Sequence, residues 1–153
     1  MTAFPAFSLP GSDGSTHSVK SLAGSPYILY FYPRDMTPGC TTESCDFRDR
    51  HSDLKKLGVR VFGVSTDSLD SHAKFIAKEK LNFVLLADEA HVLADKLGVW
   101  KEKNMYGKKS FGIERSTFLV DAAGQITQEW RKVKVDGHVA EVIAAATSLA
   151  AAT

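Results

Sequence analysis

Short, continuously apolar runs are spaced along the chain between polar, glycine-containing segments. Residues 27–33 (YILYFYP) and 59–66 (VRVFGVST) are two such runs, which are typical of strands buried on both faces of a sheet. Residues 82–88 (NFVLLAD) predict a third strand, and residues 116–130 (STFLVDAAGQITQEW) predict two strands joined by a glycine-containing turn. The pattern therefore predicts a sheet with buried central strands.

The segments between and after these strands have helical character. In residues 68–81 (SLDSHAKFIAKEKL), the side chains of Leu69, Ala73 and Ile76 share one stripe. Such a stripe is the face that an amphipathic helix turns toward the core. Residues 138–152 are rich in good helix formers and predict a closing helix.

The order of the elements predicts the fold class. Residues 7–19 predict an N-terminal hairpin with Gly, Asp and Ser in its turn, and residues 89–99 predict a short helix that ends at Gly98. Strands and helices alternate, and a hairpin and a final helix follow. We therefore expect an α/β fold with a central mixed sheet and helices on both faces. No linker or repeat divides the chain, so we expect a single domain over residues 1–153.

Composition narrows the classes of function. The 153 residues are 44% hydrophobic and 24% charged, which is ordinary for a globular domain that is stable without disulfides or metals. A net charge of +1 gives no electrostatic footprint for nucleic acid or an anionic membrane. Residues 1–15 lack the basic and apolar regions of a secretory signal, and no apolar run is long enough to span a bilayer. We expect a cytoplasmic protein, in whose reducing compartment a cysteine pair is more often catalytic or redox-sensing than structural.

Both cysteines lie in one short segment, residues 37–45 (TPGCTTESC). Thr37 is a candidate N-cap and Pro38 a candidate first residue of a helix that continues to about residue 57. Cys40 then falls in the first turn, where unpaired N–H groups and the positive end of the helix dipole favour an anion such as a thiolate. An inert buried cysteine is the alternative, and the Thr-Pro-Gly approach favours a reactive one.

The spacing of the two cysteines constrains what they can do. On an intact helix a separation of five residues places Cys40 and Cys45 roughly 8–9 Å apart, beyond disulfide reach without movement of the backbone. Cys40 shares the core-facing stripe of this helix, and Cys45 lies nearer the polar flank. The pair can form a bond only if the first turns unwind. A metal site built from Cys40, Cys45 and His51 is a competing interpretation, but it lacks a fourth ligand and compact spacing.

Residues 31–49 (FYPRDMTPGCTTESCDFRD) resemble the active-site segment of peroxiredoxins, specifically the bacterioferritin comigratory protein (peroxiredoxin Q) subfamily. The family pattern P-x-x-x-T-x-x-C is matched by Pro33, Thr37 and Cys40, and its distant arginine by Arg115 in IERSTFLVD. Further segments fall in family order over nearly the whole chain. The resemblance implies a thioredoxin-like fold with an N-terminal β-hairpin extension.

The resemblance also implies an activity: the reduction of hydrogen peroxide and organic hydroperoxides. Cys40 is then the peroxidatic cysteine, which becomes a sulfenic acid. Cys45 is the resolving cysteine, which forms an intramolecular disulfide that thioredoxin or a similar dithiol reduces. We expect a monomer that needs no metal, flavin or haem.

The remaining candidate site residues have physical roles in such a reaction. Arg115 would stabilise the thiolate and donate to the peroxide, while Thr37 offers a hydroxyl. Gly39 and Cys40 offer backbone N–H groups, and Pro33 offers an apolar wall without an N–H. Taken alone, Arg115 would be read as a solvated charge at the end of a strand.

Five further features could have either a structural or a functional role. Glu43 either orients an arginine or supports the helix start, and His51 is expected to be a packing residue rather than a catalytic base. Residues 101–109 (KEKNMYGKK) predict a solvated loop that could flank the pocket. Trp100 and Trp130 are expected to be structural.

Two other classes of function stay open from the sequence. A general disulfide oxidoreductase would normally carry C-x-x-C, which is absent from this chain. A non-enzymatic redox sensor or binding module on the same fold would need the cysteine switch but no peroxide pocket, and it would react with peroxide slowly or only once per chain.

Overall fold

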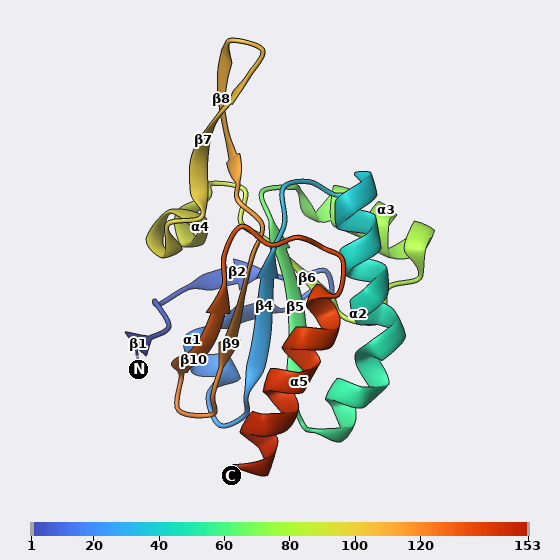
Figure 1. Ribbon diagram of the computed structural model, residues 1–153, viewed down its shortest axis with the longest axis vertical. Helices are drawn as coiled ribbons and strands as arrows, with labels where there is room; N and C mark the ends of the chain where they lie inside the picture. The colour runs from blue at the N-terminus through green and yellow to red at the C-terminus, as the bar shows by residue number, and fades with distance from the viewer. Residues whose placement is uncertain (1, 153) are drawn as a thin grey trace.

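A six-stranded mixed sheet forms the centre of the molecule (Figure 1). The structure is a computed structural model that describes residues 2–152, apart from the side chain of residue 105. In spatial order the strands are β1 (Thr2–Ala3), β10 (Gln125–Trp130), β9 (Ser116–Val120), β4 (Tyr27–Phe31), β5 (Arg60–Ser65) and β6 (Val84–Ala87). β4, β5 and β6 are parallel, and β9 runs antiparallel to β4. The predicted mixed sheet is confirmed.

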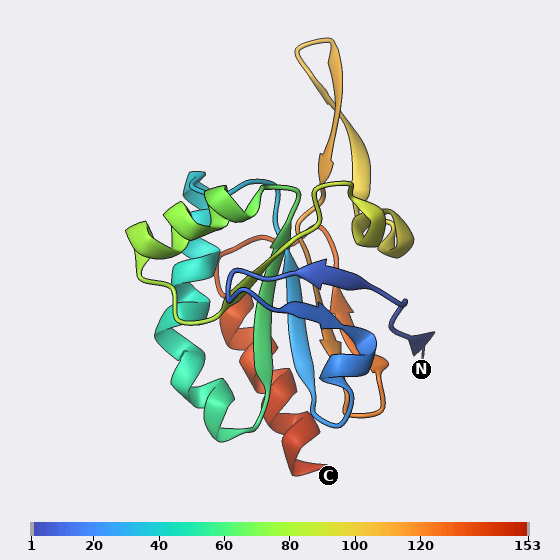
Figure 2. The same cartoon turned by 180° about the vertical axis from the view of Figure 1, so that it is seen from behind.

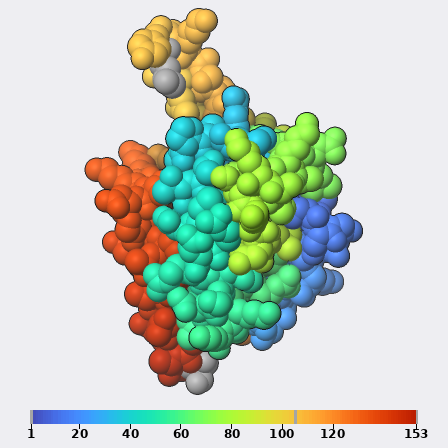
Figure 3. Space-filling view, turned by 90° about the vertical axis from the view of Figure 1, so that its right-hand side faces the viewer, coloured from blue at the N-terminus to red at the C-terminus, as the bar shows by residue number. Residues whose placement is uncertain are grey.

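Helices cover both faces of this sheet, as the sequence predicted. On one face lie α2 (Pro38–Lys56), α5 (His138–Ala151) and α3 (Leu69–Glu79), and Figure 3 shows α2 and α3 side by side. On the other face lie α1 (Val19–Leu22), α4 (Val92–Leu97) and the predicted hairpin of β2 (Ser8–Pro10) and β3 (Thr16–Ser18) (Figure 2). No helix among residues 2–152 is both long and apolar enough to cross a membrane.

The burial of β4 on both faces of the sheet explains why its residues are apolar without interruption. All five of its residues are buried, and alternate side chains enter the core clusters on the two faces of the sheet. On the α2 face the ring of Tyr30 stacks on Phe47 of α2, with the ring centroids 4.6 Å apart. On the other face Phe31 packs edge-on against Phe118 of β9. The contact between Tyr30 and Phe47 holds α2, which carries both cysteines, against the centre of the sheet.

The predicted apolar stripe of α3 is wrong at two of its three residues, because only Ile76 packs against the core. Leu69 is 39% exposed and Ala73 is also exposed, whereas the buried residues of this helix are His72 and Phe75. Both ring nitrogens of His72 have hydrogen-bond partners, so a residue that reads as polar in the sequence can lie inside. The helix is therefore rotated relative to the expectation from apolar spacing.

Residues 101–109 are mostly exposed, as expected, but they lie in a second β-hairpin rather than in a loop. β7 (Trp100–Met105) pairs with β8 (Lys108–Ile113), and the hairpin projects from the body of the molecule (Figures 1 and 2). Tyr106 and Gly107 in its turn both have positive φ, 54° and 79°, which suits a two-residue hairpin turn. Because most of the hairpin is solvated on both sides, it lacks the alternation of apolar and polar residues that predicts a half-buried strand.

Candidate active site

The cysteine segment lies where β4 ends and α2 begins. Thr37 has the extended backbone of an N-cap (φ −85°, ψ 154°), and its carbonyl accepts the first helical hydrogen bond from the N–H of Thr41 at 2.8 Å. Pro38 is the first helical residue, as predicted. The Thr37 hydroxyl donates to the carbonyl of Arg34 at 3.0 Å, so it does not cap the helix. The N–H groups of the first turn are thus left to stabilise negative charge.

Arg115 reaches this helix start because of the strand register. Phe31, the last residue of β4, pairs with Ser116, the first residue of the antiparallel strand β9. Arg115 therefore stands beside the end of β4, although it is 75 residues from Cys40 in the sequence. Its Nη2 donates to Cys40 Sγ at 3.2 Å, and Cys40 is only 1% exposed.

Gly39 leaves room for this contact. A Cβ atom at Gly39 would lie 3.2 Å from Nη2 of Arg115, which is tighter than an ordinary van der Waals contact. The glycine before the cysteine thus lets the guanidinium approach the helix start closely. A larger residue would have to move the arginine away from the sulfur.

Glu43 orients Arg115, which decides between the two roles that the sequence left open. Its Oε1 accepts from Nη1 of Arg115 at 2.5 Å, and the carboxyl group is fully buried. Burial raises the pKa of Glu43 from 4.5 to about 7, although Arg115 acts in the opposite direction. The second oxygen, Oε2, has no hydrogen-bond partner, and Nε2 of His138 lies 3.9 Å from it.

His138, which the sequence did not single out, completes the surroundings of Glu43. Its Nε2 is 2.8 Å from the hydroxyl oxygen of Thr117, and its ring meets that of Trp130 edge-on at 5.8 Å. Burial, together with the nearby Arg115, lowers the pKa of His138 to about 4. The ring is therefore neutral at pH 7. Trp130 packs here against the core, in agreement with its expected structural role.

Cys45 lies one and a half turns further along the same continuous helix and is partly buried. Both cysteines are free thiols, and burial raises the pKa of Cys45.

His51 is half-buried beside Phe83, with the ring centroids 6.2 Å apart, and burial lowers its pKa. Within residues 2–152, no three His, Cys, Asp or Glu side chains are grouped so that they could hold a metal ion.

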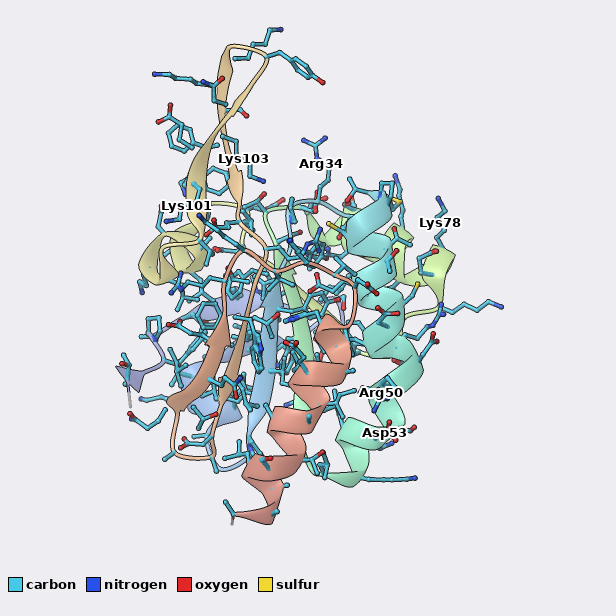
Figure 4. All side chains as sticks on the ribbon, in the orientation of Figure 1. Arg34, Arg50, Asp53, Lys78, Lys101 and Lys103 are labelled. Carbon is cyan, nitrogen blue, oxygen red and sulfur yellow. The ribbon has the colours of Figure 1, made fainter. Side chains whose placement is uncertain are left out.

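A cavity of about 490 Å³ opens beside the helix start. It is lined by Pro33, Arg34, Thr37, Thr66, Asp67, Trp100, Lys103, Phe111 and Gly112. The hairpin of β7 and β8 thus contributes one wall, on which the ring of Trp100 stacks with those of His91 and Phe111. Figure 4 shows Arg34 extending outward beside this hairpin, with Lys103 on β7. A larger cavity, of about 640 Å³ near β1 and β10, shares none of these residues.

The structure brings together five of the six candidate site residues from the sequence, and the sixth, Cys45, lies further along α2. Cys40, Gly39 and Arg115 meet directly, while Pro33 and Thr37 line the cavity beside them. Lys103 lines the cavity, in agreement with the expectation that residues 101–109 could flank the pocket. Sequence reasoning missed Trp100 and Phe111 in the same wall and the buried partner His138. The basic, aromatic composition of residues 100–113 was the available signal for the wall.

These features define a thiol redox protein: a mixed sheet with a buried thiol at a helix start, paired with an arginine. The chain belongs to the AhpC/TSA family, whose model matches residues 1–129. It is 51% identical to peroxiredoxin Bcp of Bacillus subtilis over 139 residues, which cover 91% of this chain and 88% of the relative. Identity to peroxiredoxin Bcp of Escherichia coli K12 is 45% over 134 residues, or 88% and 86% of the two chains.

Solved structures of peroxiredoxin Q proteins also resemble this chain in fold and sequence. Peroxiredoxin Q of Xanthomonas campestris superposes with a TM-score of 0.89 at 46% identity, covering 94% of this chain and 91% of the other. A PrxQ mutant of Xylella fastidiosa also gives 0.89, at 35% identity and with 97% and 96% covered. A further Xanthomonas campestris structure, also at 0.89 and 46% identity with 94% and 92% covered, is that of a bacterioferritin comigratory protein with alkyl peroxide reduction activity. The thioredoxin-like fold and the peroxiredoxin resemblance of the sequence are confirmed.

Proposed function

We propose that the chain is a thiol-dependent peroxidase that reduces hydrogen peroxide and organic hydroperoxides. The observation that carries the proposal is the 3.2 Å contact between Nη2 of Arg115 and Sγ of Cys40 at the start of α2. A guanidinium and free N–H groups at a helix start stabilise a thiolate, and a thiolate is the form that attacks peroxides. Relatives named peroxiredoxin, at 45–52% identity, support the same activity.

In the first step the Cys40 thiolate attacks one oxygen of the hydroperoxide. A sulfur–oxygen bond forms, the O–O bond breaks, and the departing oxygen takes up a proton and leaves as water or an alcohol. Cys40 is oxidised to a sulfenic acid, and the hydroperoxide is reduced. Arg115 and the N–H groups of the first turn are placed to stabilise the charge that develops on the oxygens. The Thr37 hydroxyl donates to the carbonyl of Arg34, so in this arrangement its oxygen can accept a hydrogen bond from the hydroperoxide at the cavity wall.

In the second step Cys45 attacks the sulfenic acid, releases water and forms the Cys40–Cys45 disulfide. Because the two cysteines are roughly 8–9 Å apart on an intact helix, the segment between them must unwind. That segment contains Glu43 and Ser44, whose contacts with Arg115 and with the Tyr30 hydroxyl (2.8 Å) would then break. The rest of α2 stays anchored through its buried side chains further along.

Reduction of the disulfide closes the cycle. We propose that thioredoxin or a similar dithiol supplies the two electrons, and that the enzyme works as a monomer in the cytoplasm. Size-exclusion chromatography coupled to light scattering of the reduced protein measures the oligomeric state. A dimer would contradict that part of the proposal and leave the chemistry of Cys40 intact.

A steady-state assay with thioredoxin, its reductase and a hydroperoxide tests the activity. Wild-type protein should turn over many times, and Cys40→Ser should abolish turnover. Cys45→Ser is the matched control, because it keeps the first step and should consume one peroxide per chain. Turnover that survives Cys40→Ser, or a wild type that reacts only once in the presence of the reductant, would contradict the proposed enzyme.

A further inference from the structure

The loop between β4 and α2, residues 32–37, is held from inside by Asp35. The side chain of Asp35 is 1% exposed. Its Oδ1 accepts from the Tyr32 hydroxyl at 2.5 Å, and its Oδ2 accepts from the Ser71 hydroxyl at 2.8 Å. Nδ1 of His72 lies 2.8 Å from the same Oδ2. The backbone N–H of Asp35 donates to Oδ2 of Asp67 at 2.8 Å, so side chain and backbone are both fixed.

The side chain of His72 is 0% exposed. Its Nε2 lies 2.9 Å from the carbonyl oxygen of Leu86 in β6, which can only accept a hydrogen bond. Nε2 must therefore donate to this carbonyl, while Nδ1 forms the hydrogen bond with Asp35.

The geometry links this pair to the cavity of about 490 Å³ beside the helix start. Asp35 lies between Pro33 and Thr37, which both line the cavity, and Met36 beside it has a positive φ of 64°. A non-glycine residue in that conformation persists only where its surroundings enforce it. His72 does not touch the cavity, and it connects the loop to α3 through Asp35 and to β6 through the carbonyl of Leu86.

We infer that His72 is a positioning residue of the peroxide reaction. By holding Asp35 it fixes the loop so that Pro33 and Thr37 face the hydroperoxide when the Cys40 thiolate attacks. The inference rests on the proposed peroxidase function. Because His72 contacts neither Cys40 nor Arg115, its loss should slow attack on a hydroperoxide without changing the general reactivity of the thiol.

Two polar substitutions of similar size separate the contacts of His72. The amide of His72→Asn can replace Nδ1 as the donor to Asp35 but cannot reach Leu86. The amide of His72→Gln can replace Nε2 at Leu86 but leaves Asp35 without this donor. Each reduced variant is mixed with a hydroperoxide in a single turnover, and separately with iodoacetamide, an electrophile that needs no peroxide pocket.

His72→Gln should lower the second-order rate with peroxide by about 10- to 100-fold, because small misplacements of reacting groups have costs of that order. His72→Asn should stay within about threefold of the wild type, and alkylation of Cys40 should stay within about twofold in both variants. Amide exchange of residues 33–37 should rise in His72→Gln only. His17→Gln is the control, because His17 pairs with Asp13 at 3.0 Å in the N-terminal hairpin, away from the loop.

Equal peroxide rates in His72→Gln and His72→Asn would overturn the inference. So would a fall in alkylation that matches the fall in peroxide rate, because it would indicate a general structural effect. The amide-exchange comparison needs no activity, so it tests the loop even in a variant that is partly unfolded. A wild type without peroxide turnover would refute the proposed function itself, whereas an active wild type with two wild-type-like variants would refute only the role of His72.

Discussion

Glu43→Gln should remove the contribution of Glu43, which lowers the stability of the wild type as the pH rises from about 4.5 to 7. The buried carboxyl of Glu43 has a pKa raised from 4.5 to about 7, chiefly by burial. In this window the unfolded chain has released the proton and the folded protein still holds it. The folded protein therefore binds more protons, and its stability falls as the pH rises. Gln cannot ionise, so the variant should lack this fall.

The magnitude follows from the interval between the two pKa values. At 1.36 kcal/mol per pKa unit, the interval from 4.5 to about 7 corresponds to about 3 kcal/mol. His138 acts in the opposite direction, because its pKa is lowered from 6.5 to about 4 and stability is gained as the pH rises between these values. It is present in both proteins, so its contribution cancels in the difference between variant and wild type.

Urea unfolding at several pH values between 4 and 8 measures this difference. The free energy of unfolding of Glu43→Gln minus that of the wild type should rise by about 3 kcal/mol between pH 4.5 and 7. Glu141→Gln is the matched control, because Glu141 is exposed on α5, and its difference should stay constant. A constant difference for Glu43→Gln as well would refute the assignment of a raised pKa to this buried carboxyl.

Three further changes test the site. Gly39→Ala should displace Arg115 from Cys40 and slow the peroxide step by about tenfold in stopped-flow measurements, and an unchanged rate would contradict the close approach of the guanidinium. Cys45→Ser should stop after one peroxide as a sulfenic acid that a dimedone probe labels, and efficient recycling by thioredoxin would exclude Cys45 as the resolving cysteine. Phe111→Ala should raise the KM for cumene hydroperoxide and leave that for hydrogen peroxide unchanged, because only the bulky substrate needs the apolar wall; equal effects on both would exclude this role.

The local signals of the cysteine segment were sufficient to place Cys40. An apolar strand, an N-cap residue and a proline at the first helical position all act within a few residues of one another, and the structure has each where the sequence predicted it. Arg115 could be found only through the family resemblance. Its contact with Cys40 depends on the register that pairs Phe31 with Ser116, which no local pattern reveals.

Buried polar pairs could not be predicted for the same reason. Charged and polar residues are mostly exposed, so His72 and Asp35 read as surface positions until their partners are known. The stripe expected on α3 left out His72, which is buried, and included Ala73, which is exposed. The role of Glu43 was left undecided because it depends on Arg115, a partner 72 residues away.

Hydrogen exchange of the reduced and oxidised proteins tests the central claim most directly. Cys40 and Cys45 lie on one continuous helix and must come together to form the disulfide. After one equivalent of peroxide, mass spectrometry should find an intramolecular Cys40–Cys45 bond, and amides of residues 38–46 should exchange faster than in the reduced protein, with the central strands unchanged. An oxidised protein that contains this bond while the helix stays fully protected would contradict the account, as would oxidation that links only separate chains.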